Sequence, residues 1–97
     1  MSNIILSNSS KTGKRYMVQI NDKIIHFGSS EHENFTIHKD EKRKQNYISR
    51  HAKNEDWSNI LTAGFWSRWL LWNKPTIRES IKDIERNFGV KIISKIN

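Results

Sequence analysis

The sequence predicts a small domain of the α+β class, and three observations support this prediction. Near the N-terminus, "KRYMVQINDKIIHFG" alternates apolar and polar residues on both sides of a two-residue break, which is typical of a β-hairpin. Further along, "TIRESIKDIERNFG" repeats apolar residues at helical spacing between a start and a stop signal. A second alternating stretch, "VKIISKI", follows. We therefore expect an N-terminal β-hairpin and a C-terminal strand packed with about three helices around an aromatic-rich core.

The chain has 97 residues and no internal repeat, so we expect one domain covering residues 1–97. A domain of this size buries only about 60 to 65% of the surface of its unfolded chain, which requires a compact core. Residues 1–12 are expected to be flexible or bound by a partner. Cysteine is absent, which excludes disulfides and thiolate metal sites and fits a reducing compartment.

The hairpin is expected to consist of strands over residues 14–20 and 23–27, joined by a tight turn at residues 21–22. Gly28 should end the second strand. Apolar cross-strand pairs would then lie on one face of the hairpin, which stabilises a sheet. These pairs are Tyr16 with Phe27 and Val18 with Ile25.

After the hairpin, residues 28–38 are expected to form a loop held to the core by Phe35 and Ile37. Asp40 can cap a helix over residues 41–53, because its carboxylate can accept a hydrogen bond from an unpaired amide of the first turn. This helix would be polar and basic with a thin apolar seam.

The clearest local pattern lies in the last third of the chain. Thr76 and Glu79 form a capping box, and Gly89 follows the last turn of a helix predicted over residues 77–88. The apolar stripe of this helix consists of Ile77, Ile81, Ile84 and Phe88. A final strand follows, with Val90 and Ile92 on one face and Ile93 on the other.

The segment "ILTAGFWSRWLLW", residues 60–72, concentrates aromatic side chains. Its thirteen residues are too few to span a bilayer, which takes about 20. A helix there would be apolar nearly all round and would belong inside the fold or under a partner. We expect burial, with a protein interface, lipid and base stacking as alternatives. The predicted core consists of Tyr16, Val18, Ile25, Phe27, Phe35, Trp57, Phe65, Trp66, Trp69, Leu70, Ile81, Ile84 and Phe88.

The chain is strongly basic, with a formal charge of +7 and a pI near 9.9. Such a charge favours nucleic acid as a partner, although it also serves solubility alone. Cations concentrate on and beside the helix predicted over residues 41–53, and others lie on the polar face of the helix over residues 77–88. The candidate nucleic-acid-binding residues are Lys39, Lys42, Arg43, Lys44, Arg50, Lys53, Arg78, Lys82 and Arg86.

Two interpretations of these cations stay open. Exposed lysines and arginines bind phosphates of any sequence, because each contact releases a condensed counterion. Alternatively, Arg43 and Arg50 form ion pairs with Asp40 and the Glu55-Asp56 pair and so brace the fold. We favour phosphate contact for Lys42 and Lys44, and a structural role for Arg50.

A catalytic or metal site is not expected. His38, Asp40 and His51 are residue types found in metal-dependent nucleases, but they lack the compact spacing of metal ligands. No serine lies in a glycine-rich nucleophile elbow. We therefore expect a protein that is not an enzyme and that needs no cofactor.

The segments "FTIHKDEKRKQNYISRHAKNEDW" and "TAGFWSRWLLWNKPTIRESIKDI" resemble a family of short uncharacterised proteins of large double-stranded DNA viruses. The resemblance covers most of the chain from Lys14 onward and implies a single-domain viral protein, but no functional residues. The expected function is that of a sequence-independent nucleic-acid-binding accessory. The alternative is a virion structural protein that docks on viral structural proteins through its aromatic surface. The N-terminus has no secretion signal, so an intracellular location in the infected host cell, or the virion interior, is expected.

Overall fold

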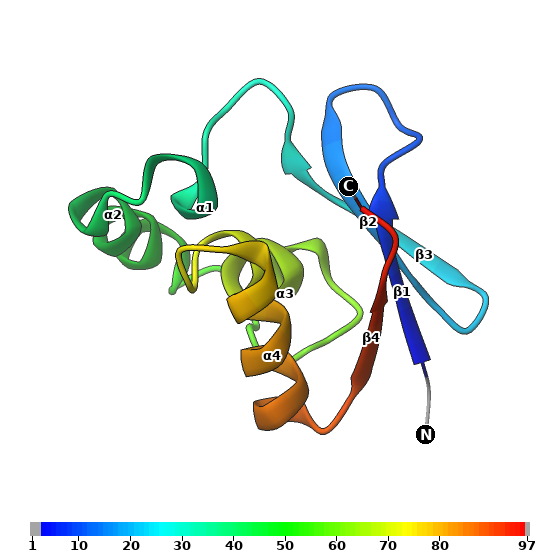
Figure 1. Ribbon diagram of the computed structural model, residues 1–97. Coiled ribbons are helices and arrows are strands. Elements are labelled where there is room, and N and C mark those ends of the chain that lie inside the picture. The colour runs from blue at the N-terminus through cyan, green and yellow to red at the C-terminus, as the bar shows by residue number, and fades with distance from the viewer. Residues whose placement is uncertain (1–2, 97) are drawn as a thin grey trace.

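A four-stranded β-sheet carries the helices on one of its faces (Figure 1). The computed structural model describes residues 3–96. The strands are β1 (Asn3–Asn8), β2 (Lys14–Ile20), β3 (Lys23–Ser29) and β4 (Lys91–Ser94), in the spatial order β3-β2-β1-β4. The pairs β3-β2 and β2-β1 are antiparallel, whereas β4 runs parallel to β1. The predicted α+β class is therefore confirmed.

The predicted hairpin forms with its expected register. Tyr16 lies opposite Phe27, and Val18 lies opposite Ile25. Asn21 adopts a left-handed backbone conformation, with φ of 56°, as the tight turn between paired strands requires. The expectation that Gly28 ends the second strand is wrong, because β3 continues to Ser29.

Strand β1 lies between β2 and β4, so residues 3–8 belong to the centre of the sheet. This differs from the expectation that residues 1–12 are flexible or bound by a partner; residues 1 and 2 lie outside the described part. The reason is packing: Ile4 and Leu6 are 1% and 0% exposed and point to the covered face of the sheet. The same face is lined by Val18 and Ile92 from the neighbouring strands.

Two helices follow the hairpin and stand at one end of the molecule (Figure 1). Helix α1 (Phe35–His38) is a single turn capped by Asn34, in place of the expected loop. Phe35 is buried as predicted. Ile37 is 44% exposed, so the expectation that it anchors this segment to the core is wrong. Helix α2 (Glu41–His51) is capped by Asp40, whose carboxylate accepts hydrogen bonds from two backbone amides of the first turn.

The aromatic segment forms helix α3 (Ala63–Trp66), which continues into a wider π-helical turn, η1 (Ser67–Leu71). Helix α4 (Ile77–Phe88) then forms with the predicted bounds. Thr76 and Glu79 make the predicted capping box, and Gly89 closes the helix with φ of 66°. Within residues 3–96, none of the helices is long and apolar enough to cross a membrane.

The aromatic segment supplies much of the core. Phe65, Trp66 and Leu70 are fully buried, as predicted, and the Trp66 indole N–H donates to the Ile60 carbonyl at 2.8 Å. Five predicted core residues are only partly buried: Tyr16, Trp57, Trp69, Ile81 and Phe88. Six buried hydrophobic residues of the described part were not predicted: Ile4, Leu6, Ile20, Tyr47, Leu71 and Ile92.

Arg68 stands among these aromatic residues without a carboxylate partner in the described part of the chain. Its guanidinium lies over the rings of Trp69 and Trp57, with the guanidinium carbon 4.4 and 5.4 Å from their centroids. It also donates to the Trp72 carbonyl at 2.8 Å. Desolvation by burial lowers the pKa of this arginine. Cation–π contacts therefore make one charged residue part of an aromatic cluster.

Candidate nucleic-acid interface

Lys44, one of the two lysines expected to contact phosphate, is a structural residue. Its ammonium donates to the Asn73 carbonyl at 2.7 Å and lies 4.8 Å from the centroid of the Phe35 ring. Only 17% of its side chain is exposed. The expectation that Lys44 is exposed is therefore wrong, because its long stem reaches back to the loop before α4. Lys42 remains exposed.

The two arginines of α2 also differ from the expected pairing. Arg43 forms an ion pair with Glu33 at 3.3 Å, not with Asp40, which caps the helix. Both partners are about half exposed, so the pair contributes little to stability. Arg50 is exposed and has no ion-pair partner among residues 3–96, which removes the expected reason for a structural role.

The remaining candidate cations lie on solvent-exposed positions. Lys39 at the end of α1 donates to the Thr36 carbonyl at 2.7 Å. Lys53 follows α2 and is exposed. The cations of α4 lie on a separate helix, on its exposed side; they are Arg78, Lys82 and Arg86.

The weak metal candidates do not meet. Within residues 3–96, no group of three or more histidine, aspartate or glutamate side chains is placed to hold a metal ion. His38 accepts a hydrogen bond at Nδ1 from the Asp40 backbone amide at 2.9 Å, and its ring packs 5.2 Å from the Trp72 ring. His51 instead stacks on Tyr47, with ring centroids 4.4 Å apart.

We predict that the folded state becomes less stable as pH falls below about 6.5, in part through His38. Burial, and after it the positive charge of Arg43, lowers the pKa of His38 from 6.5. The unfolded chain therefore binds this proton first, and the stability is lost as pH falls from 6.5 toward the folded value. Protonation also removes the Nδ1 lone pair that accepts from Asp40.

The measurement is the melting temperature between about pH 7.5 and pH 5. In His38→Gln the melting temperature should fall less between these pH values than in the wild type. In His32→Gln, which changes an exposed histidine, it should fall as much as in the wild type. Identical pH profiles for His38→Gln and the wild type would contradict the prediction.

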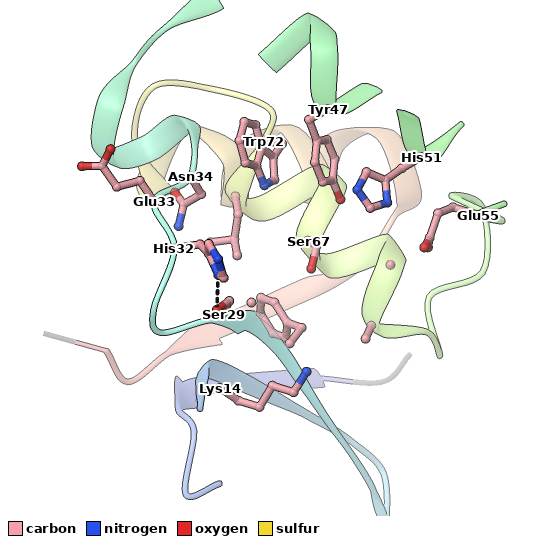
Figure 2. Close-up of a pocket in the computed structure, with 15 residues that line it drawn as sticks. Lys14, Ser29, His32, Glu33, Asn34, Tyr47, His51, Glu55, Ser67 and Trp72 are labelled. Atoms are coloured by element: carbon pink, nitrogen blue, oxygen red, sulfur yellow. Dashed lines mark hydrogen bonds between the residues drawn. The ribbon is translucent and has the colours of Figure 1, made fainter. Parts of the chain in front are cut away.

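A pocket of about 460 Å³ opens between strand β3 and the helices α2 and η1 (Figure 2). Its volume lies within the range of small-molecule sites. A second hollow of about 390 Å³ adjoins it, since both are lined by His32, Glu33 and Trp72. The second hollow adds three polar side chains from one face of α2: Arg43, Asn46 and Arg50.

Three rings of a four-ring column form the roof of the pocket: Trp72, Tyr47 and His51. Tyr47 lies between Trp72, at 4.5 Å and 1° between ring planes, and His51, at 4.4 Å and 30°. His38 continues the column beyond Trp72. Both faces of the Tyr47 ring are therefore covered, and its hydroxyl edge points into the pocket (Figure 2).

Polar groups of different kinds converge on this pocket. Burial, and then the charge of Glu55, raises the pKa of Tyr47 to about 12, so its hydroxyl stays protonated. The Ser29 hydroxyl bonds to His32 Nδ1 at 2.8 Å on the opposite wall. The Glu55 carboxylate rests against the backbone of Gly64, where any Cβ atom would collide with it. The arrangement offers donors and two carboxylates to a polar ligand: Glu55, and Glu33, which is paired with Arg43.

This pocket could not be identified from the sequence. The sequence indicated a basic helix over residues 41–53, but nothing in it connected that helix with Lys14 or Ser67, which come from β2 and η1. Tyr47 carried the one usable signal, an isolated large aromatic residue on a polar helix.

Residues 4–51 match the model of a family described as a family of unknown function (DUF5754). The matched part contains β1, the hairpin, α1 and α2, and it ends before the aromatic segment. No curated protein and no solved structure matches the chain.

Proposed function

We propose that the protein binds nucleic acid without sequence preference through the exposed face of α2, here called the α2 face. Its residues are Lys42, Arg43, Asn46, Arg50 and Lys53. One observation carries the proposal: Arg43, Asn46 and Arg50 are three and four residues apart and line the same hollow.

The chemistry of this face suits a phosphate backbone. Guanidinium groups bind phosphate through two parallel hydrogen bonds, and the released counterions add a favourable term that is independent of sequence. Arg50 and Lys42 have no carboxylate partner among the described residues, so their charges are free to act on a ligand. The net charge of +7 favours the approach of a polyanion.

The double variant Lys42→Gln with Arg50→Gln should weaken binding to mixed-sequence DNA and lower the magnitude of the salt slope by about one for each phosphate that is no longer neutralised. Filter binding over a series of salt concentrations measures both quantities. The melting temperature should hardly change, because both side chains are exposed.

The matched control is Lys23→Gln with Lys91→Gln, which removes the same charge from exposed positions of the sheet. An equal loss of binding in the two double variants would show that net charge, not the α2 face, determines binding. Absence of DNA binding by the wild type at low salt would reject the proposal.

The alternative of a virion structural protein has less support. It required an exposed aromatic surface, whereas Phe65, Trp66 and Leu70 of the aromatic segment are fully buried. The exposed large hydrophobic residues are Ile24, Ile37, Leu61 and Ile93, which lie on four separate elements or loops. A viral origin, with action in the infected cell or the virion, remains part of our proposal on the strength of the resemblance.

A further inference from the structure

We propose that the pocket beneath Tyr47 holds one sugar-phosphate unit of the bound nucleic acid and recognises it by its backbone, not by its base. This inference rests on the proposed function and names the part of the ligand that the pocket accepts. It follows from the unpaired donors, the position of the carboxylate and the covered aromatic faces.

Three hydrogen-bond donors in the pocket have no partner. The Tyr47 hydroxyl, the Ser67 hydroxyl and the Lys14 ammonium line the pocket, and none of them bonds to another residue within 3–96. They come from α2, η1 and β2; Figure 2 shows Tyr47 and Ser67 on the helix side of the pocket and Lys14 on the sheet side. The Tyr47 ring is buried and its hydroxyl faces the pocket, so an acceptor on a ligand there would pair a hydroxyl that has no partner among the described residues.

An anionic oxygen is the acceptor that best suits these three donors. Hydrogen bonds to an ionised acceptor are shorter and about twice as strong as neutral ones, and the lysine adds charge attraction. The raised pKa of Tyr47, about 12, keeps its proton available to donate. In the adjoining hollow, Arg50 has no ion-pair partner among the described residues and can hold the next phosphate along the chain.

The Glu55 carboxylate lies on the side of the pocket formed by Tyr47 and His51, opposite Lys14 (Figure 2). A carboxylate repels a phosphate but accepts hydrogen bonds from hydroxyl groups. A ligand with an anion near Lys14 and a hydroxyl donor near Glu55 suits this pocket. That describes a ribose phosphate, because a ribose unit of RNA keeps its 2′-hydroxyl whereas an internal deoxyribose unit of DNA has no free hydroxyl. Gly64 permits this arrangement, because a side chain there would displace the carboxylate.

The covered rings of the pocket roof exclude base stacking. Trp72 and His51 cover both faces of Tyr47, so the column offers edges to the pocket. Stacking on aromatic faces is the usual way in which single-stranded bases are held. With both of its faces occupied, Tyr47 offers no stacking surface to a base, in agreement with binding that ignores sequence.

The test uses the full chain and two probes, a mixed-sequence single-stranded RNA oligonucleotide and ribose 5-phosphate, whose binding is followed through the indole N–H resonances in NMR spectra. Tyr47→Phe removes the hydroxyl and keeps the aromatic column; it should weaken oligonucleotide binding about tenfold, as the loss of a hydrogen bond to a charged group does. Lys14→Gln should weaken it similarly. Ribose 5-phosphate should shift the Trp72 resonance in the wild type and not in Tyr47→Phe.

The matched controls are Tyr16→Phe, on the sheet outside the pocket, and Lys23→Gln, at the far end of β3. If Tyr47→Phe and Lys14→Gln bound the oligonucleotide with wild-type affinity, the proposed role of the pocket would be rejected. Binding through the α2 face would not be affected by that result. A Tyr47-dependent shift with ribose 5-phosphate but no oligonucleotide binding would instead support the pocket and reject the proposed function. If the wild type bound neither probe, both the role of the pocket and the proposed function would be rejected.

Discussion

Trp66→Ala should lower the free energy of unfolding by about 3 to 5 kcal/mol, the usual cost of removing a fully buried tryptophan. Trp66 has no exposed surface and packs between Phe27 of β3 and Phe65, with ring centroids 6.1 and 5.1 Å away. Truncation would leave a cavity between sheet and helices, and it would leave the Ile60 carbonyl without its indole donor. The total free energy of unfolding of a small domain is about 5 to 15 kcal/mol, so this loss is a large part of it.

Urea unfolding followed by circular dichroism measures this change. Ile24→Ala is the control, because Ile24 is 52% exposed on the open face of the sheet and its truncation should cost no more than about 0.5 kcal/mol. Equal losses in the two variants would contradict the position of Trp66 in the core.

Gly28→Ala should cost about 2 to 4 kcal/mol, because two effects coincide at this residue. Its φ of 77° lies in the left-handed region, where a Cβ atom costs about 1 to 2 kcal/mol. The added Cβ would also lie 2.8 Å from Cδ1 of Leu71, a buried side chain that would have to shift. Overpacking of that kind costs about 1 to 3 kcal/mol.

Gly13→Ala separates the two effects. Gly13 has φ of 86° but no heavy atom within 4 Å of the added Cβ, so only the backbone cost of about 1 to 2 kcal/mol applies. The difference between the two glycine variants in denaturant unfolding measures the close approach of β3 to η1. Identical losses would show that Leu71 moves aside freely.

The elements that could be predicted from the sequence are those specified by neighbours in the chain. Helix α4 has its cap, apolar stripe and terminal glycine within residues 76–89, and the β2-β3 hairpin has its register set by a two-residue turn. Local signals of this kind act over a few residues, so they can be recognised without knowledge of the tertiary structure.

Strand β1 could not be predicted because its partners are distant. Its parallel pairing joins Asn3 to Lys91 and Ile4 to Ile92, and no feature of residues 3–8 indicates that partner. Three consecutive apolar residues followed by polar ones give neither a clear alternation nor a turn signal.

Only part of the candidate site could be predicted, because the rest depends on contacts between residues that are distant in the chain. The basic residues of α2 were recognised as candidates, and Arg43 and Arg50 do line one hollow, but the sequence of a helix cannot show what lies against it. Lys44 was expected to be exposed, yet the loop at Asn73 offers a carbonyl within reach of its flexible stem. Tyr47 was grouped with the cations, whereas Trp72 and His51 make it the middle of a column.

The parallel pairing of β1 with β4 has a consequence for biosynthesis. During translation, β1 leaves the ribosome early, but its second edge stays unpaired until residues 91–94 have emerged. An unpaired strand edge is a template for pairing with another chain. Nascent chains arrested between α4 and β4 should therefore be the species most prone to associate with one another, and completion of β4 should end that risk by closing the exposed edge of β1.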